Sequence, residues 1–191
     1  MPFEFIKGEM EDIFLIRSTI FKDIRGHFRE LFHQREFKEL ISDIGFVQDN
    51  LSYSIRGVIR GLHYQLRYPQ AKLVYIIKGK IFDVAVDIRR GSPTFLRWES
   101  HLLRDSSTDG IFIPEGFAHG FCVLSEYALI MYKCTEFYHP EDEYGISWKD
   151  PDLSIPWPIS DPILSEKDRY LPFLRDINEE ELPIYRGFKN I

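Results

Sequence analysis

An all-β fold, built as a sandwich or barrel of short strands, is the architecture that this 191-residue sequence predicts. Short runs rich in β-branched and aromatic residues recur through the middle of the chain, with turn residues between them. Aromatic side chains are abundant, with 16 Phe, 10 Tyr and 3 Trp, and they suit the core of a β-sheet. No internal repeat or linker divides the chain, so residues 1–191 are predicted to form a single domain.

The first half of the chain contains one convincing helix. Apolar residues recur at helical spacing from Phe37 to Ile44, and Gly45 follows as a stop signal. This pattern predicts a helix over residues 36–43. After it the apolar residues recur with a period of two, which indicates strands.

Residues 73–77 and 81–88 are β-rich runs on either side of the turn sequence Lys78-Gly79-Lys80, and together they predict a β-hairpin. In the second run, apolar residues alternate with Asp83 and Asp87. The hairpin is therefore expected to bury one face only.

Three more short runs, residues 111–113, 121–124 and 127–131, extend the pattern of a sandwich or barrel. After Tyr138 the chain becomes acidic and rich in Pro, which predicts ordered loops over the barrel. Ser165 and the three residues after it have the composition of a capped helix start. Residues 171–191 carry no pattern that assigns them.

The charge of the chain is unevenly distributed. The formal net charge is −6, which argues against a protein that wraps nucleic acid or binds a membrane surface through basic residues. Residues 51–104 nevertheless carry 10 basic and 3 acidic side chains, between two acidic flanks. A basic middle third inside an acidic protein is consistent with an anion-binding site.

Two cysteines, Cys122 and Cys134, lie inside apolar runs, so we expect them to pack in the core. Two thiols build neither a disulfide framework nor a four-ligand zinc site. The first eight residues lack a sustained apolar stretch, and no later run approaches the ~18 apolar residues that a membrane span requires. These observations predict a cytoplasmic protein with no membrane partner.

The segment Arg60-Gly61-Leu62-His63-Tyr64-Gln65 is the first that is suited to chemistry. Alternation along a strand places His63 and Gln65 on one face, and the cations Arg60 and Lys72 lie on either side of the histidine in the sequence. A surface histidine beside solvated charges is the alternative that this pattern leaves open.

His119 and Tyr132 are two further candidates. His119 follows the turn Pro114-Glu115-Gly116, and a tight turn before a strand is one way that a β-barrel presents a side chain at its mouth. Tyr132 shares a strand face with Ala128 and Ile130, which predicts a place inside the barrel. A tyrosine that serves only the core remains an alternative.

The two histidine segments resemble the paired motifs of the cupin superfamily, whose small jelly-roll barrels often hold a metal. The first motif has Gln65 where metal-binding cupins have a second histidine, and Lys72 occupies the region of their glutamate. A cationic side chain beside a bound metal is electrostatically unfavourable, so no metal is expected. The mouth of the barrel is better interpreted as an anion site.

Five segments extend the resemblance. They are Arg60-Gly61-Leu62-His63-Tyr64-Gln65, Lys72-Leu73-Val74, Phe82-Asp83-Val84-Ala85-Val86-Asp87-Ile88-Arg89, Ile113-Pro114-Glu115-Gly116-Phe117-Ala118-His119-Gly120-Phe121 and Leu164-Ser165-Glu166-Lys167-Asp168. In this order and spacing they closely resemble the dTDP-4-dehydrorhamnose 3,5-epimerase family, from about Phe14 to Asp168. The resemblance implies an all-β, cupin-like jelly-roll barrel with a few short peripheral helices.

The resemblance also implies a cofactor-independent epimerase that converts dTDP-4-dehydro-6-deoxy-D-glucose to dTDP-4-dehydro-L-rhamnose. Epimerisation beside a ketone needs a base, a cation near the enolate oxygen and an acid on the opposite face. By resemblance His63 is the base, Asp168 its orienting carboxylate, Lys72 the enolate stabiliser and Tyr132 the acid.

The family further implies a binding site for a dTDP-sugar substrate. Arg60 and His119 would lie in its anion-binding part, and Phe21 and Phe121 would wall the sugar. The deoxythymidine region would be lined by Arg25, Phe28, Glu30, Gln48, Asn50 and Tyr138. Part of this pocket would come from a second subunit, in a homodimer with exchanged N-terminal strands. One departure is His27, where the family usually has an aromatic residue after Arg-Gly, so contacts near the base or sugar are expected to differ.

Other functions remain compatible with the sequence. A related 3-epimerase or 3,4-ketoisomerase would share the barrel and most of the pocket. Enzymes of a different class would be metal-dependent cupins that use His63 and His119. A non-catalytic barrel would bind the sugar nucleotide without exchanging its protons.

Overall fold

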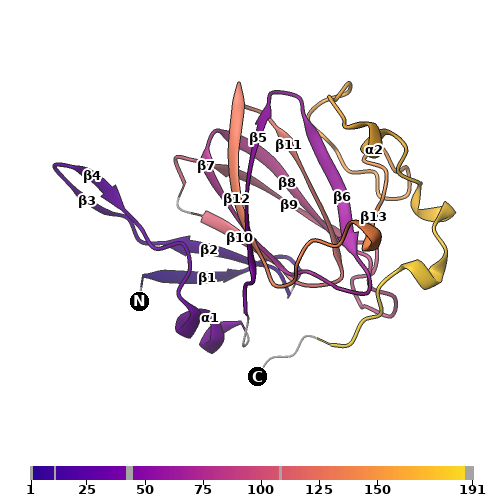
Figure 1. The fold of residues 1–191 in the computed structure, drawn as a ribbon, viewed down its shortest axis with the longest axis horizontal. Helices are drawn as coiled ribbons and strands as arrows, with labels where there is room; N and C mark the ends of the chain where they lie inside the picture. Colours follow the sequence, from indigo (N-terminus) through magenta and orange to yellow (C-terminus); the bar gives the residue numbers. More distant parts are fainter. Residues whose placement is uncertain (1, 11, 42–44, 108, 188–191) are drawn as a thin grey trace.

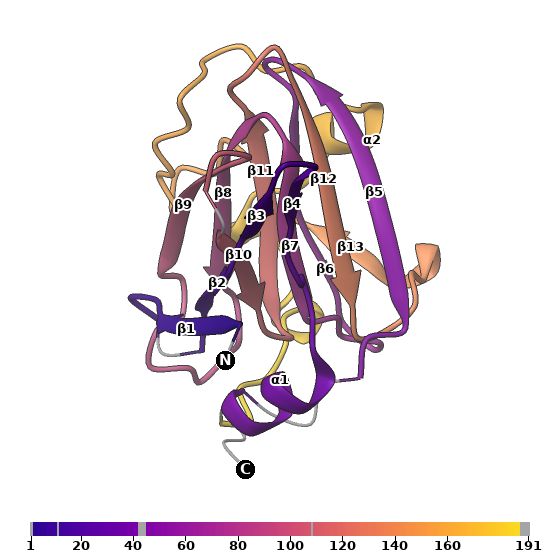
Figure 2. The same ribbon diagram turned by 90° about the vertical axis from the view of Figure 1, so that its left-hand side faces the viewer.

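Two antiparallel β-sheets packed face to face form the body of the molecule (Figures 1 and 2). The computed structural model describes residues 2–10, 12–41, 45–107 and 109–187. The first sheet has the strand order β1 (Phe3–Lys7), β2 (Phe14–Ser18), β10 (Asp109–Ile113), β7 (Lys72–Lys78), β12 (Tyr127–Cys134) and β5 (Gln48–Ile55). The second has the order β13 (Glu143–Gly145), β6 (Ile59–Gln65), β11 (Phe117–Val123), β8 (Lys80–Asp87) and β9 (Trp98–Arg104).

The remaining elements are short and peripheral. A separate two-stranded hairpin, β3 (Phe21–Asp23) and β4 (Gly26–Phe28), stands away from the barrel. The helices are α1 (Gln34–Leu40), α2 (Glu166–Arg169) and the 3₁₀ turns η1 (Pro140–Asp142), η2 (Leu174–Asp176) and η3 (Glu179–Glu181). An all-β fold with a few short peripheral helices is thus confirmed. Among the described residues, no helix is long and apolar enough to cross a membrane.

Three apolar clusters hold these layers together. Inside the barrel, residues of both sheets meet, including Ile76 of β7, Ala85 of β8 and Ile130 of β12. The outer face of the first sheet packs against α1, where Phe37 is completely buried. The outer face of the second sheet is covered by the C-terminal part of the chain, and Leu174 belongs to that cluster. The central strands of the second sheet, β11 and β8, are therefore buried on both faces.

The predicted hairpin between residues 73–77 and 81–88 is wrong, although both runs are strands. β7 pairs with β10 and β12 in the first sheet, whereas β8 pairs with β11 and β9 in the second. The turn at Gly79, with φ +95°, carries the chain from one sheet to the other. A Cβ atom at this position would overlap the carbonyl oxygen of Tyr127. Periodicity identifies a strand, but it does not identify the strand's partner.

The expectation of one buried face along residues 81–88 is also wrong. The apolar residues of β8, such as Val84 and Val86, face outward, and the C-terminal segment covers them. The alternating carboxylates Asp83 and Asp87 are fully buried on the opposite face. Both are paired, because a buried charge without a partner is costly. Asp87 accepts hydrogen bonds from Arg89, while Asp83 contacts His119.

The other predicted elements differ from the structure mainly in their bounds. The helix predicted over residues 36–43 begins earlier, at Gln34, and ends at Leu40, while residues 42–44 lie outside the described residues. The runs at 111–113 and 127–131 are parts of β10 and β12, and that at 121–124 overlaps the end of β11. Ser165 caps α2 as expected, because its side chain accepts a hydrogen bond from the backbone N–H of Asp168. Cys122 and Cys134 are buried and unpaired with each other, as predicted.

Residues 171–187, which the sequence left unassigned, pack on the second sheet. Leu174 and Leu182 join its outer apolar cluster, and the hydroxyl of Tyr64 donates to the Glu181 carbonyl at 3.0 Å. This segment therefore covers the outer face of the second sheet, whose strands carry polar residues on their inner face.

Replacing Leu174 with Ala should lower the free energy of unfolding by about 2–4 kcal/mol, because it leaves a cavity under the C-terminal segment. The matched control is Leu102→Ala on β9, where the leucine is 42% exposed rather than 8%. This control should change stability by less than about 1 kcal/mol. Urea unfolding measures both variants. Equal losses would contradict the assignment of the segment to the core.

Candidate active site

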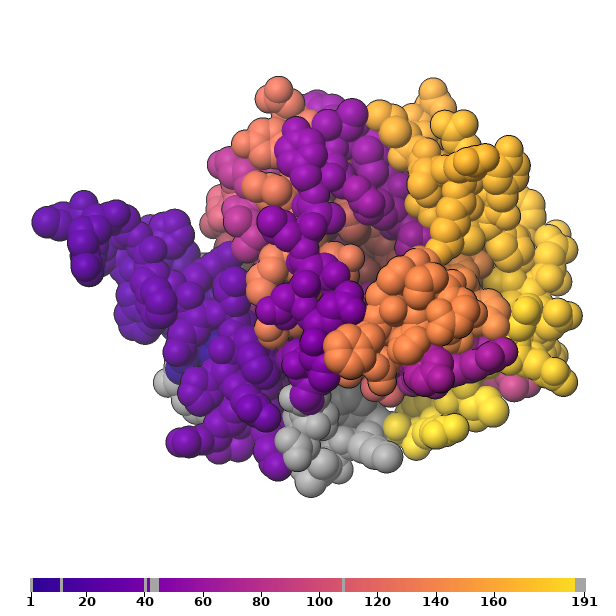
Figure 3. Space-filling model, in the orientation of Figure 1, coloured from indigo at the N-terminus to yellow at the C-terminus, as the bar shows by residue number. Residues whose placement is uncertain are grey.

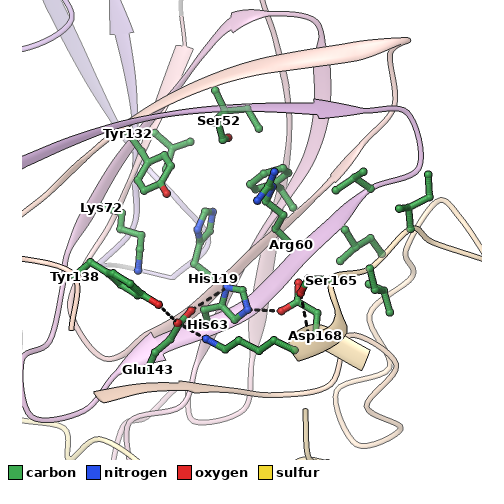
Figure 4. A pocket seen from close by; sticks show the side chains of 18 residues that line it. Ser52, Arg60, His63, Lys72, His119, Tyr132, Tyr138, Glu143, Ser165 and Asp168 are labelled. Atoms are coloured by element: carbon green, nitrogen blue, oxygen red, sulfur yellow. Dashed lines mark hydrogen bonds and ion pairs between the residues drawn. The ribbon is translucent and has the colours of Figure 1, made fainter. Parts of the chain in front are cut away.

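A cavity of about 530 Å³ opens into the barrel between the two sheets. Figure 4 shows its ionisable side chains converging from both sheets and from α2. A second cavity of about 260 Å³ adjoins it and shares part of its wall. The shared residues are His63, Lys72, Tyr132, Tyr138 and Glu143.

His63 and Asp168 form a close pair at the wall of this cavity. Alternation along β6 turns Leu62 and Tyr64 to the outer cluster and His63 to the cavity, as predicted. The Nε2 atom of His63 lies 2.6 Å from Oδ1 of Asp168. Burial acts to raise the pKa of Asp168, but the contacts with His63 and Ser165 outweigh it and hold the pKa below the ordinary value. Asp168 is therefore an ionised acceptor at neutral pH.

The backbone around Ile163 fixes the position of α2. The N–H of Ile163 donates to the Gly57 carbonyl at 2.9 Å, and its own carbonyl accepts from the N–H of Ile59 at 3.1 Å. This isolated bridge ties the segment before α2 to the start of β6, the strand that carries His63. A four-residue helix has little stability of its own, so this attachment and the Ser165 cap place the carboxylate.

Tyr132 and Lys72 enter the cavity from neighbouring strands of the first sheet. In the β12–β7 register Tyr132 lies opposite Val74, and Lys72 lies two pairs further along, opposite Cys134, and so on the same face. Burial raises the pKa of Tyr132, so its phenol stays protonated at neutral pH. Burial lowers the pKa of Lys72, although Glu143 acts in the opposite direction.

Arg60 and His119 lie on adjacent strands of the second sheet. The guanidinium of Arg60 donates to the Ser54 hydroxyl at 3.0 Å, and no carboxylate pairs with it among the described residues. His119 is the direct cross-strand neighbour of His63, and its Nε2 atom lies 2.9 Å from Oδ2 of Asp83. The predicted residue Phe121 lies in the same wall. Two histidines, each beside a buried carboxylate, thus stand side by side in the barrel.

The predicted nucleoside residues Gln48, Asn50 and Tyr138 gather in the adjoining cavity. The side-chain amide of Gln48 donates to Oδ1 of Asn50 at 2.9 Å and accepts from the backbone N–H of Tyr138 at 2.9 Å. This network leaves the Tyr138 ring at the surface, 51% exposed, where it can be stacked by a planar group.

The structure does not bring the remaining predicted residues into the cavity of the same chain. Phe21, Arg25 and Phe28 belong to the β3–β4 hairpin, which Figures 1 and 3 show projecting from the body of the molecule, and Glu30 follows it. The two phenylalanines are 54% and 64% exposed. Arg25 instead pairs with Asp23 at 2.5 Å.

Glu143, Lys167 and Asp83 are site residues that the sequence did not predict. Glu143 lies among the Pro-rich loops after Tyr138, where the pattern gives no strand, yet β13 pairs with β6 and turns its side chain to the cavity. Lys167 precedes Asp168 on α2 and pairs with Glu143. Asp83 could have been recognised from the sequence. An acidic residue inside an apolar run needs a buried partner when both faces of its strand are covered.

Gln65, which stands where metal-binding cupins have a second histidine, has a different use here. Gln65 donates to the carbonyls of Tyr68 at 2.7 Å and Phe137 at 3.1 Å, so its amide shapes a loop. Within the described part of the chain, no group of three or more His, Cys, Asp and Glu side chains is placed to hold a metal ion.

Proton transfer at a carbon beside a carbonyl is the chemistry that these groups suit. A histidine held by an ionised carboxylate is a general base, a protonated phenol is a general acid, and a desolvated lysine stabilises an oxyanion. The fold and the cavity together therefore define a cupin-like isomerase.

Comparisons with known proteins make the assignment specific. Residues 7–176 match the family of dTDP-4-dehydrorhamnose 3,5-epimerases. A relative of that name from Methanothermobacter thermautotrophicus is 48% identical over 186 residues, which is 96% of this chain and 98% of the relative. The chain belongs to the dTDP-4-dehydrorhamnose 3,5-epimerase family.

Solved structures agree with this assignment and confirm the jelly-roll barrel. A dTDP-6-deoxy-D-glucose-3,5-epimerase from Legionella pneumophila, in complex with dTDP-4-keto-L-rhamnose, superposes with a TM-score of 0.93 at 45% identity, over 97% of this chain and 100% of that one. A 3'-monoepimerase from Streptomyces bikiniensis, in complex with dTDP-quinovose, superposes with a TM-score of 0.88 at 33% identity, over 94% of this chain and 92% of that one.

Changing Asp168 to Asn should destabilise the protein by about 1–3 kcal/mol at neutral pH, because a hydrogen bond to a charged group is lost. The pKa of Asp168 lies below its ordinary value of 3.8, so the ionised form stabilises the fold above that pH. This stabilisation disappears as the pH falls through the lower folded value. Thermal unfolding at pH 7 and near pH 2.5 should therefore show a difference from wild type that narrows in acid.

The control is Asp152→Asn, whose carboxylate is 43% exposed and pairs with Arg175 on the surface. It should alter stability by no more than about 1 kcal/mol. A pH-independent loss for Asp168→Asn would contradict the ionic character of its bond to His63.

Proposed function

We propose that this protein epimerises dTDP-4-dehydro-6-deoxy-D-glucose at C3 and C5, giving dTDP-4-dehydro-L-rhamnose for dTDP-L-rhamnose biosynthesis. The observation that carries the proposal is the 2.6 Å contact between His63 and Asp168 in a cavity that also contains Lys72 and Tyr132. Membership of the epimerase family supports the substrate.

His63 is the base. The 4-keto group acidifies the protons on both neighbouring carbons, so one histidine is suited to remove either. Because Asp168 is ionised and only accepts hydrogen bonds, the hydrogen of the neutral ring sits on Nε2. The lone pair of Nδ1 is then free to take a substrate proton, and Asp168 stabilises the imidazolium that forms.

Lys72 and Tyr132 complete the proton transfer. Removal of the proton places negative charge on the C4 oxygen, where the desolvated ammonium of Lys72 interacts strongly. Tyr132 returns a proton on the other face of the sugar ring, since burial keeps its phenol protonated. Figure 4 shows both residues across the cavity from Asp168. A proton leaves and a proton returns, so the reaction needs no redox cofactor.

The nucleotide part of the substrate extends toward the barrel mouth. Arg60 and His119 bind the diphosphate, Phe121 walls the sugar, and Gln48, Asn50 and Tyr138 contact the deoxythymidine. Arg60 has no carboxylate partner among the described residues, which supports its assignment to an anion.

The active unit of the proposal is a homodimer with exchanged N-terminal strands. Phe21, Arg25, Phe28 and Glu30 would then enter the pocket of the second copy. The projecting hairpin supports this arrangement, because its apolar side chains lie exposed in the single chain. Exposed Leu51, Tyr53 and Ile55 on the edge strand β5 offer an apolar surface for the partner.

Turnover in heavy water tests the reaction directly. With dTDP-4-dehydro-6-deoxy-D-glucose, the product should carry deuterium at both C3 and C5, which NMR or mass spectrometry detects. Label at C3 alone would indicate a 3-epimerase, and binding without label would indicate a non-catalytic barrel. Loss of activity on metal removal would indicate a metal-dependent cupin.

The two proton-transfer residues should fail in different ways. His63→Ala should lower both deuterium exchange and product formation by at least about 10²-fold, because no base remains. Tyr132→Phe should lower product formation by a similar factor while His63 still exchanges the substrate proton. Substrate recovered from the Tyr132→Phe reaction should therefore contain deuterium with its configuration unchanged. Full turnover in either variant would refute the assigned roles.

A further inference from the structure

The ladder between β6 and β11 is irregular at one point beside the cavity. His63 lies opposite His119. The next pair toward the start of β6 is Arg60 with Phe121, so two residues of β6 stand against one residue of β11. An arrangement of two residues against one is a β-bulge. Its members are Gly61, Leu62 and Gly120.

The bulge decides which way the side chain of Arg60 points. Successive residues of a regular strand point to opposite faces, so Arg60 and His63, three positions apart, would lie on opposite faces. Directly paired residues of antiparallel strands share a face, and Phe121 belongs to the interior cluster. Arg60 therefore lies in the cavity wall together with His63 (Figure 4). Its guanidinium is held there by β5, where the Ser54 hydroxyl and the Tyr53 carbonyl accept its hydrogen bonds.

Two glycines make this bulge possible. Gly61 has φ +117°, a backbone conformation that residues with a side chain rarely adopt. A Cβ atom there would lie 2.6 Å from Cα of Gly120 and 2.6 Å from the carbonyl oxygen of His119. A Cβ atom at Gly120 would lie 2.8 Å from the carbonyl oxygen of Arg60. The two backbones therefore approach more closely than a side chain at either position would allow.

The same bulge supports the carboxylate that holds the base. The backbone N–H of Gly61 donates a hydrogen bond to Asp168. The backbone of Leu62 exchanges hydrogen bonds with Ile146 at 3.1 and 2.9 Å, so its polar groups are satisfied on the side away from β11. The irregular stretch of β6 is thus fixed on both sides, which gives the residues around it a defined direction.

We propose that Gly61 and Gly120 are positioning residues, whose close contact turns Arg60 to the face of the barrel that carries the base His63. The inference rests on the proposed function, because it explains how the diphosphate contact and the base come to lie in one cavity. A change in the direction of a side chain is a use that β-bulges beside active sites commonly have.

The test is the affinity for dTDP, measured by calorimetry for the wild type, Gly120→Ala, Arg60→Ala and the double variant. The added methyl group should displace the Arg60 backbone and weaken dTDP binding at least about tenfold, as the loss of a hydrogen bond to a charged group does. Because Gly120 acts through Arg60, the double variant should bind no more weakly than Arg60→Ala alone. Effects that multiply, or wild-type affinity in Gly120→Ala, would overturn the proposal.

Gly110→Ala is the matched control. Its Cβ atom would overlap the ring of Tyr75, and the site lies on β10, outside both cavities. This variant should lower the thermal stability of the protein and leave the dTDP affinity of the folded form unchanged. An equal loss of affinity in Gly110→Ala and Gly120→Ala would show a general effect of crowding and would also overturn the proposal.

A second measurement uses the wild-type protein, so it does not depend on whether a variant folds. Phenylglyoxal modifies accessible arginine side chains, and mass spectrometry locates the labelled ones. Bound dTDP should protect Arg60 but not Arg104, which lies exposed at the end of β9. Equal labelling of Arg60 with and without dTDP would mean that the bulge does not turn it into the nucleotide site, against the proposal. A wild-type protein that does not bind dTDP would instead contradict the proposed function.

Discussion

The hydrogen bond between His63 and Asp168 is the interaction on which the site depends, and 105 positions of sequence separate its partners. β6 presents the imidazole, while the carboxylate comes from a four-residue helix that has little stability of its own. The chain solves this by fastening the segment before α2 to the start of β6 through the Ile163 backbone. His63 and Asp168 are therefore both anchored to β6, so small movements of the loops have little effect on the distance between them.

Burial of the central strands of the second sheet on both faces sets a further constraint. An ionisable side chain buried in the middle of β8 or β11 is shielded from bulk water, so it needs a partner. Asp83 meets His119, and Asp87 meets Arg89. The cations of the basic middle third divide in the same way: Arg89 is paired inside the fold and Lys78 meets Asp105 at the surface, whereas Arg60 and Lys72 face the cavity. A net charge of −6 is thus compatible with an anion site, because the two cations at the cavity affect a bound anion more than the net charge of the whole protein does.

Much of the site could be predicted from the sequence, because motif residues such as His63 and His119 sit where strand alternation places them. Other features depend on pairing, which periodicity does not encode. The run at 81–88 was recognisable as a strand, but its membership of the second sheet was not, and so Asp83 and Asp87 seemed to belong to an open face. Glu143 was invisible for a related reason: β13 has three residues and exists only because it pairs with β6. The hairpin residues Phe21 and Phe28 show a third limit, since in the proposed homodimer their site would be shared between two copies and is not contained in one chain.

The position of Asp168 late in the sequence has a consequence for the synthesis of the protein. Synthesis at roughly 5–20 residues per second adds the 105 positions after His63 in about 5–20 s. During that interval the segment that carries His63 has been synthesised, but Asp168 has not. The segments that follow later in the chain both supply Asp168 and cover the second sheet. Under the proposed function, a nascent chain without Asp168 lacks the carboxylate that orients its base, so the active site is completed together with the fold.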